Sequence, residues 1–300
     1  MIDQRRGRNL AVAVTGTRGL PFIWGHALQS SMRADAASGI FDWSGLGTTA
    51  QVIRYDARAH GESCDEYDPQ ACRWESLAHD MWRVADDCGA DTAVLGGASM
   101  GCATALIGAM QQPERVRGLV LVIPPTAWEL RPRQVRAYRM MARVVRFTGN
   151  LPFRLAAMML GNATRGSALR AMAREVVREL ATRDPRNVQA AFEGAALSDL
   201  PSPERLAKLD MPALILAWKN DSAHPVAVAQ TLAAAMPNAT LIVAADDAAI
   251  RRWPEELRHF LGSIPRTRAK ARTPVPRPQA ARVARGAKPA RDPSSPVDYG

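Results

Sequence analysis

The stretch Gly96-Gly97-Ala98-Ser99-Met100-Gly101 decides the predicted fold, because it joins an apolar run to a segment of small residues. The preceding run, Thr92–Leu95, predicts a buried strand, and Gly101–Met110 predicts a helix. A serine between glycines at such a junction predicts a sharp turn that exposes the hydroxyl at the N-terminus of the helix. A serine hydroxyl is a weak nucleophile unless a base accepts its proton, so a reactive Ser99 requires a base close by.

Strands and helices alternate along most of the chain. Apolar runs predict six further strands, at Leu10–Val14, Pro21–Trp24, Gln51–Tyr55, Val116–Ile123, Pro212–Ala217 and Ala239–Ala244. The glycines at positions 16 and 19 predict a turn, after which the second of these strands returns. Helical spacing predicts helices at Trp74–Cys88, Val226–Ala235 and Ala248–Leu261. The alternation predicts an α/β fold with a mainly parallel central sheet and helices on both faces.

The interval from Ala127 to Leu200 breaks this alternation, since it contains no convincing strand and is rich in Ala, Arg and Met. It predicts several helices inserted between two strands, in a position to cover the strand ends. We therefore divide the chain into a first core part (1–126), a helical cap insertion (127–205), a second core part (206–262) and a tail (263–300). The methionines of Arg139–Arg143 and Leu155–Leu160 are predicted to pack between helices, or alternatively to line an apolar pocket.

The net charge of +10 is concentrated in the tail, where nine basic residues stand against two acidic ones among seven prolines. A segment of this composition cannot bury enough apolar surface to offset its ordering entropy, so it predicts a disordered basic extension. We expect a solubilising tail, with a loose tether to nucleic acid or anionic lipid as the alternative. We expect no specific nucleic-acid partner, and only weak contacts of the tail with polyanions.

The four cysteines, Cys64, Cys72, Cys88 and Cys102, form no CxxC pair, and only five histidines are present, so no zinc site is expected. Cys64 and Cys72 could meet in one loop, but free thiols in a reducing compartment are the preferred interpretation. No apolar run is long enough to span a bilayer, and the first residues lack the apolar segment of a signal peptide. We therefore expect a cytoplasmic protein without a transmembrane segment.

Three further stretches, together with Gly97–Gly101, resemble the α/β-hydrolase family. Trp24–Ser31 resembles its oxyanion-loop motif, and Tyr55–Ser63 resembles its D-x-R-G-H-G-x-S segment. Leu216–Val226 resembles the loop after a late strand that carries the catalytic acid. The resemblance covers nearly the whole predicted folded part, in the family's order and spacing. It implies the α/β-hydrolase fold with a helical cap. No cofactor motif is visible in the sequence, so we expect no cofactor.

The resemblance also implies roles for individual residues. Ser99 matches the nucleophile and Asp221 the acid, while the backbone N–H groups of Leu28 and Met100 match the donors of the oxyanion hole. His26 and His60 match positions that are structural in the family, so we expect hydrogen-bonded loop histidines there. Ala27 and Ala59 stand where the family usually has glycine.

The general base is the exception. The loop in which the family carries its base histidine corresponds to Ala244–Pro254, which contains an acidic pair, Asp246 and Asp247, and no histidine. Three alternatives stay open: His224, three residues after the acid, acts as a substitute base; one of the two loop acids does so with a raised pKa; or the protein binds a ligand without hydrolysing it. The next histidine, His259, lies in the final predicted helix and is expected to be exposed.

These observations predict a serine hydrolase that acts on a small apolar ester or related acyl compound. Its candidate catalytic residues are Ser99, Asp221 and His224, and the apolar character of the substrate follows from the Met- and Leu-rich insertion. The alternative is a non-catalytic or atypical ligand-binding relative. The hypothesis of a nucleic-acid-associated protein depends on the composition of the tail alone.

Overall fold

The computed structural model describes residues 10–63, 66–160, 168–219, 221 and 223–265. These residues belong to one compact unit, residues 1–267, and residues 268–300 form a second unit that lies outside the described part. Of the predicted tail, residues 263–300, Ser263 still belongs to the last described helix and Ile264 is buried in the core. The rest of the tail, from residue 266 onwards, and Cys64 lie outside the described residues. Among the described helices, none combines the length and the apolar character needed to cross a bilayer.

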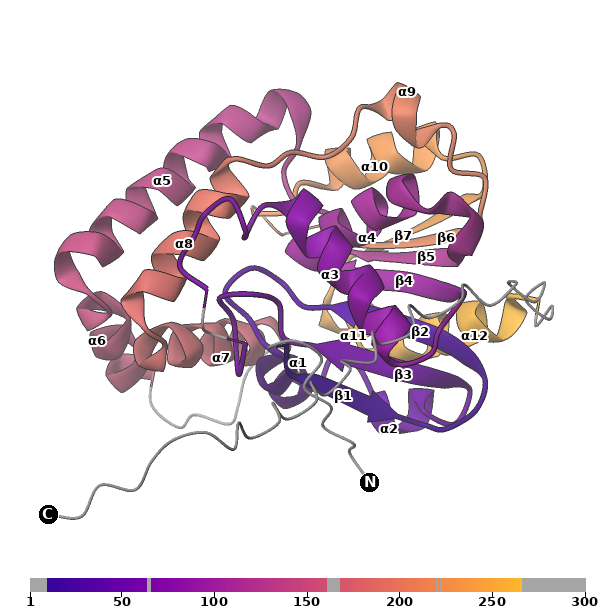
Figure 1. Cartoon of the computed structure of the whole chain (residues 1–300), viewed down its shortest axis with the longest axis horizontal. Coiled ribbons are helices and arrows are strands. Elements are labelled where there is room, and N and C mark those ends of the chain that lie inside the picture. The colour runs from indigo at the N-terminus through magenta and orange to yellow at the C-terminus, as the bar shows by residue number, and fades with distance from the viewer. Residues whose placement is uncertain (1–9, 64–65, 161–167, 220, 222, 266–300) are drawn as a thin grey trace, which may run out of the picture. The chain divides into compact units, whose positions relative to one another are not determined.

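A seven-stranded sheet forms the centre of the described unit (Figure 1), in the order β1-β3-β2-β4-β5-β6-β7. Its strands are β1 (Val12–Thr15), β2 (Leu20–Gly25), β3 (Ala50–Tyr55), β4 (Ala93–Ala98), β5 (Val116–Val122), β6 (Ala213–Trp218) and β7 (Ala239–Ala244). Only the β1–β3 pair is antiparallel, so the prediction of an α/β fold with a mainly parallel sheet is confirmed.

The predicted return of the second strand is confirmed, since β2 runs antiparallel to β1, but β3 lies between the two strands. The turn reverses the chain, as its positive φ angles at Gly16 (81°) and Gly19 (101°) show, but it does not determine which strands pair. β2 contains Phe22 and Ile23, which are fully buried on opposite faces of the sheet, and this favours an interior place for the strand.

Helices cover both faces of the sheet (Figure 1). One face carries α3 (Trp74–Asp87), α4 (Met100–Gln111) and α10 (Val226–Ala235). The other face carries α2 (Trp43–Leu46), α11 (Asp247–Ile250) and α12 (Trp253–Ser263). The predicted single helix over Ala248–Leu261 is therefore two helices, and Pro254 lies in the first turn of the second, where a missing N–H costs little.

The described residues between β5 and β6 form helices and no strand, as predicted. They are the 3-10 helix η2 (Trp128–Leu130) and the α-helices α5 (Arg131–Thr148), α6 (Leu151–Leu160), α7 (Ala168–Thr182), α8 (Pro185–Ala196) and α9 (Pro203–Leu206). A cluster of their own, centred on Val145, Val188 and Phe192, holds α5, α6, α7 and α8 together, whereas Leu206 of α9 belongs to the sheet core. The helix α1 (Met32–Ser38) packs against α7.

The predicted packing of the inserted methionines is wrong for Met140, Met158 and Met159, whose side chains are exposed. The helices α5 and α6 bury other residues instead: Val145 is fully buried in the cluster, and Phe153 packs against it. Helical periodicity identifies an apolar face, but it does not show which side of a doubly apolar helix meets the protein.

Candidate active site

Ser99 lies in a sharp turn between β4 and α4. Its φ and ψ of 51° and −104° are a strained combination for a residue with a side chain, and its own side chain caps no amide of the helix. The flanking glycines allow the close approach around it: a Cβ on Gly101 would lie 2.0 Å from the carbonyl oxygen of Gly25, and one on Gly97 would lie 2.4 Å from the carbonyl carbon of Gly101. The predicted elbow is therefore present, with the serine 5% exposed.

The structure brings Ser99, His224 and Asp221 into one hydrogen-bonded chain. The Nε2 of His224 lies 2.9 Å from the Oγ of Ser99, and its Nδ1 lies 2.6 Å from Oδ2 of Asp221. The imidazole is 19% exposed, so the chain of bonds reaches the edge of solvent. A neutral imidazole whose Nδ1–H donates to a carboxylate presents a free electron pair at Nε2, which is what a general base needs.

The local fold of the loop after β6 explains how residues so close in sequence can make this pair. The other oxygen of Asp221, Oδ1, accepts the backbone N–H groups of Ala223 (2.9 Å) and His224 (3.1 Å). An Asp side chain that binds amides two and three residues later makes a tight turn. The turn directs the imidazole back over the carboxylate that formed it.

The same contacts set the charge of Asp221. Its burial pushes the pKa of the carboxyl upward, but the hydrogen bond from His224, the charge of that ring and the two backbone amides together hold the pKa below its usual value. Asp221 is therefore ionised at neutral pH and can stabilise a positive charge on His224.

The two expected oxyanion donors, the N–H groups of Leu28 and Met100, belong to two segments that a backbone hydrogen bond joins. Met100 is the first residue of α4, so its N–H has no acceptor within the helix. Leu28 lies in a turn closed by the N–H of Ser30, which donates to the carbonyl of Ala27 (3.0 Å). The N–H of Gly101 donates to the carbonyl of His26 (3.1 Å), and this bond holds the segment that carries Leu28 beside the elbow.

A residue of the insertion, which the sequence analysis missed, holds this turn. Arg183, at the end of α7, has a nearly fully buried side chain that donates to Oε1 of Gln29 (2.8 Å) and to the carbonyls of Gln29 and Ser30 (both 3.3 Å). Gln29 follows Leu28 directly and has a φ of 64°, an unfavourable region for a residue with a side chain. Its side chain also donates to the carbonyl of Val188 (3.1 Å). The sequence carries no local signal for this role, because the burial of Arg183 and its contacts with the turn appear only in the tertiary structure.

His26 and His60 are hydrogen-bonded loop histidines, as expected. Nε2 of His26 accepts the N–H of Ala57 (3.0 Å), so its Nδ1 carries the proton and donates to the carbonyl of Ala27 (2.8 Å). Nδ1 of His60 donates to the carbonyl of Arg58 (2.7 Å). Burial, followed by the nearby positive charges, lowers the pKa of His60 well below its usual value. Both rings therefore support the loops.

The acids of the loop after β7 lie apart from this chain of bonds. Asp246 is exposed and caps α11, since its Oδ1 accepts the N–H of Ala249 (2.8 Å). Asp247 is the first residue of the same short helix. This arrangement does not favour either acid as the base. His259 is exposed on α12, as expected.

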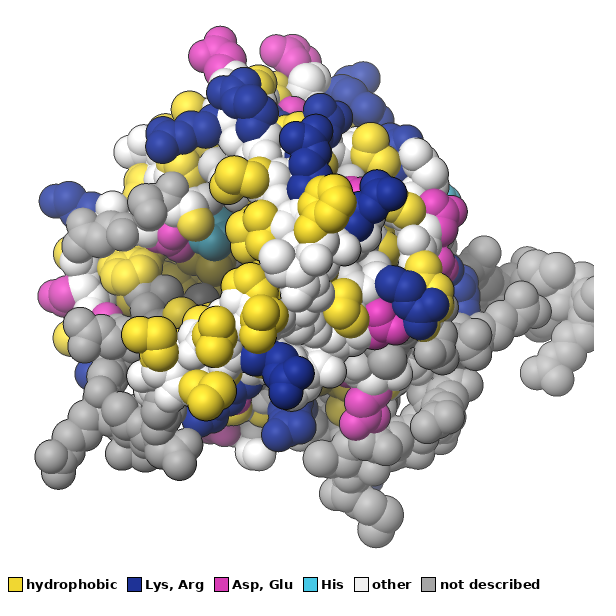
Figure 2. Space-filling view, turned by 90° about the vertical axis from the view of Figure 1, so that its left-hand side faces the viewer, with side chains coloured by type: hydrophobic (Ala, Val, Ile, Leu, Met, Phe, Trp, Pro, Cys, Tyr) yellow, Lys and Arg dark blue, Asp and Glu magenta, His cyan; other side chains and the backbone are white. Residues whose placement is uncertain are grey.

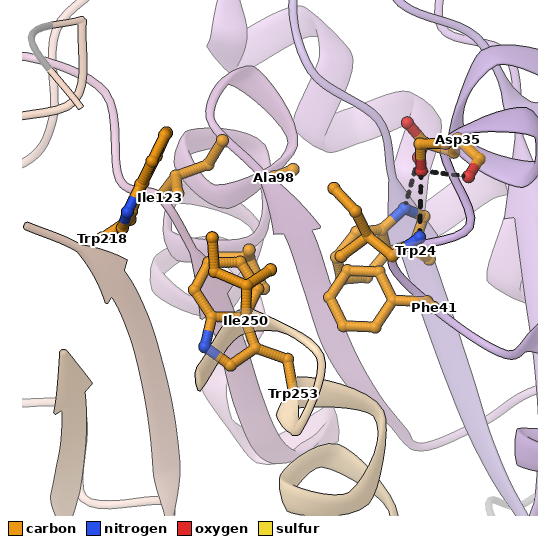
Figure 3. A pocket seen from close by; sticks show the side chains of 11 residues that line it. Trp24, Asp35, Phe41, Ala98, Ile123, Trp218, Ile250 and Trp253 are labelled. Atoms are coloured by element: carbon orange, nitrogen blue, oxygen red, sulfur yellow. Dashed lines mark hydrogen bonds between the residues drawn. The ribbon is translucent and has the colours of Figure 1, made fainter. Parts of the chain in front are cut away.

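A small cavity of about 30 Å³ lies behind the elbow, bounded by Ala98 (Figure 3). Ile250 and Trp253 face Trp24 across it, and the buried carboxylate of Asp35 at its edge accepts the indole N–H of Trp24 (2.8 Å). Burial raises the pKa of Asp35. The volume is about that of one water molecule, so this cavity is a packing void and not a substrate site.

Within the described residues, no group of three or more His, Cys, Asp or Glu side chains is arranged to hold a metal ion. Cys72 and Cys102 are buried thiols without a disulfide. Burial raises the pKa of Cys72 to about 12, so its thiol is un-ionised at neutral pH.

Known proteins share this fold. The family model of the alpha/beta hydrolase fold matches residues 36–250, well over half of the chain. The chain belongs to the alpha/beta hydrolase family. The resemblance deduced from the sequence is thereby confirmed. The search among curated proteins found no relative of this alpha/beta hydrolase.

Solved structures show the same fold. A hydrolase from Pseudomonas aeruginosa PA01 is 19% identical, with a TM-score of 0.67 over 86% of this chain and 96% of that one. A thermophilic esterase from Thermogutta terrifontis is 24% identical, with a TM-score of 0.67 over 87% and 95%. The enol-lactonase from Burkholderia xenovorans LB400 is 21% identical, with a TM-score of 0.64 over 84% and 93%. At these identities the likeness establishes the fold of this alpha/beta hydrolase.

Proposed function

We propose that this alpha/beta hydrolase is a serine hydrolase that cleaves a small apolar carboxylic ester or a related acyl compound. One observation carries the proposal: the imidazole of His224 lies 2.9 Å from the hydroxyl of Ser99 and 2.6 Å from the carboxylate of Asp221. In this mechanism Ser99 is the nucleophile, His224 the general base, and Asp221 the group that orients the ring.

The first half of the reaction acylates the serine. As Oγ of Ser99 attacks the carbonyl carbon of the ester, its proton moves to Nε2 of His224. The carbonyl oxygen becomes an anion that accepts hydrogen bonds from the N–H groups of Leu28 and Met100. When the intermediate collapses, the bond to the alcohol oxygen breaks, and the departing alcohol takes the proton from His224.

The second half releases the acid. A water molecule attacks the acyl carbon and gives a proton to His224. The second tetrahedral intermediate then collapses, and Oγ of Ser99 takes the proton back as the carboxylic acid leaves. Through both halves the ionised Asp221 stabilises the imidazolium without itself accepting a proton.

The apolar substrate class is supported by the surroundings of Leu28. Its side chain packs against the sheet core and also against the apolar cluster of the insertion, which contains Val188 and Phe192. An acyl or alkyl group next to the Leu28 amide would therefore meet aliphatic and aromatic side chains. The names of two similar structures, an esterase and an enol-lactonase, are compatible with an ester substrate.

A ligand-binding protein without catalysis is the second candidate, because the loop Ala244–Pro254 lacks the histidine that the family carries there. This candidate predicts that Ser99 is no more reactive than any other serine. The neighbouring imidazole favours the enzyme.

Labelling with a fluorophosphonate probe, together with turnover of p-nitrophenyl butyrate, distinguishes the two candidates. We expect the native protein to be labelled and to turn over the ester, and Ser99→Ala to abolish both. Ser44→Ala, which changes an exposed serine, is the matched control and should behave as the wild type. A folded wild-type protein that neither reacts with the probe nor hydrolyses the ester would favour the binding protein.

A further inference from the structure

The helix α6 turns an apolar face away from the rest of the described chain. Leu151, Leu155, Met158 and Met159 follow the spacing i, i+4, i+7 and i+8, which places them on one side of the helix. All four are exposed, Met158 to 79% and Met159 to 88%. Phe147, in the last turn of α5, is 82% exposed. We refer to these five side chains as the α6 face.

The inward side of the same helix already supplies its packing against the protein. Phe153 contacts the apolar cluster of the insertion, so the outer residues are not needed to hold α6 in place. Figure 2 shows apolar side chains gathered on this side of the molecule, along one rim of a hollow that contains a histidine side chain. Exposed apolar groups that gather in this way are typical of an interaction surface.

The charged side chains of α5 and α6 have one sign. Residues 131–160 include seven arginines and no acidic residue. Six of these arginines are exposed, namely Arg133, Arg136, Arg139, Arg143, Arg146 and Arg154. Glu193 of α8 lies in a groove with three of them and offsets part of this charge. An apolar stripe bordered by arginines is the pattern of a helix that lies in the plane of a membrane interface.

The charges also decide between two occupants. A second copy of the chain, related by a twofold axis, would set these arginines against their own copies, and the described residues of α5 and α6 offer no acid to pair with them. An anionic lipid surface satisfies both features, since acyl chains meet the apolar side chains and headgroups meet the arginines. We propose that the α6 face docks the protein onto an anionic lipid bilayer. This inference does not depend on the chemistry at Ser99.

Co-sedimentation of the full-length chain with vesicles tests the proposal. We expect binding to vesicles that contain phosphatidylglycerol in phosphatidylcholine, and much weaker binding to phosphatidylcholine alone. The double variant Met158→Ser/Met159→Ser should lower the partition coefficient about tenfold or more, because two apolar side chains no longer leave water. Arg143→Gln/Arg146→Gln should lower it as well and reduce its dependence on salt.

The control removes an apolar side chain elsewhere. Val243→Ser changes an exposed apolar residue of the edge strand β7, outside the α6 face and its arginines, and should bind as the wild type. The basic tail is present in every variant, so its contribution cancels in the comparison. Ser99→Ala should also bind as the wild type, which separates this proposal from the proposed hydrolysis.

Three results would overturn the proposal. The wild type could fail to bind the anionic vesicles, or the Met158→Ser/Met159→Ser variant could bind as tightly as the wild type, which would assign binding to the tail. Sedimentation equilibrium could show self-association that this variant abolishes, which would assign the face to a second copy of the chain.

Discussion

The loops that follow β6 and β7 leave the same edge of the sheet, because the two strands are parallel neighbours, yet their chemistry differs. The loop after β6 carries Asp221 and His224, and it directs the imidazole onto Ser99. The loop after β7, in which the family places its base, carries Asp246 as a helix cap and continues to Ile250, which lines the cavity behind the elbow.

The difference shows that a side chain can serve as the general base wherever it reaches the serine hydroxyl, whichever loop carries it. Two adjacent loops on one sheet edge can both approach the elbow, and hydrogen-bond distance is the only geometric requirement. In the loop after β6 the acid forms the turn that positions the base, so the pair is one local unit. In the loop after β7, Asp246 caps α11 and Ile250 belongs to the apolar packing.

The largest expected effect separates the two loops directly. His224→Ala should lower kcat for p-nitrophenyl butyrate on the order of 10⁶-fold, as for the loss of the histidine from other serine triads. Asp246→Asn should leave kcat unchanged, since Asn keeps the cap and removes only the charge. Equal kcat in the wild type and His224→Ala, or a large loss in Asp246→Asn, would reverse the assignment.

The next effect concerns the turn that carries the Leu28 amide. Arg183→Gln should lower kcat by about tenfold to a hundredfold with little change in KM, because the turn that carries the Leu28 amide loses its support. Arg183→Lys should recover part of the loss. Arg186→Gln, which removes an exposed arginine paired with Asp184, is the control. A change in KM alone would mean that Arg183 contributes to substrate binding and not to the oxyanion hole.

A smaller effect is expected in the dependence of stability on pH. The pKa of Asp221 is lowered in the folded protein, so its contribution to stability is present above the unfolded value of about 4 and is lost as the pH falls through the folded value. The difference in unfolding free energy between the wild type and Asp221→Asn should therefore shrink as the pH is lowered. Urea denaturation across this range measures it, and a difference that does not vary with pH would contradict the hydrogen-bonded, ionised Asp221.

The smallest effect concerns the loop after β7 alone. Asp246→Ala should lower the free energy of unfolding by about 1 kcal/mol, through the loss of the cap on α11, and leave kcat unchanged. Asp246→Ser retains a capping oxygen and should restore most of the stability. Thermal unfolding and ester turnover measure the two quantities on the same samples. An Asp246→Ala variant that is as stable as the wild type but has lost turnover would contradict the role of Asp246 as a helix cap.

Much of the core could be predicted from local pattern. The strands β5 and β6 lie within one residue of their predicted bounds, because buried parallel strands are continuous apolar runs. The edge strand β7 is only partly buried, but its apolar run and the helix α10 also match their predicted bounds. The short helices α1 and α2 received no assignment, since a helix of one or two turns has too little periodicity to detect. The exposure of Met158 and Met159 was also missed, because composition shows that a helix is apolar but not what covers it.

By itself the sequence determined the alternation of strands and helices and the strained turn at Ser99. Both depend on neighbouring residues: apolar runs between polar breaks, and glycines on either side of one serine. Only the tertiary structure decided which side chain faces that serine, because His224, Asp246 and Asp247 all follow strands that end at the same sheet edge. Their distances to Ser99 depend on the path of each loop, and Arg183 reaches the Leu28 turn only because α7 folds back over it.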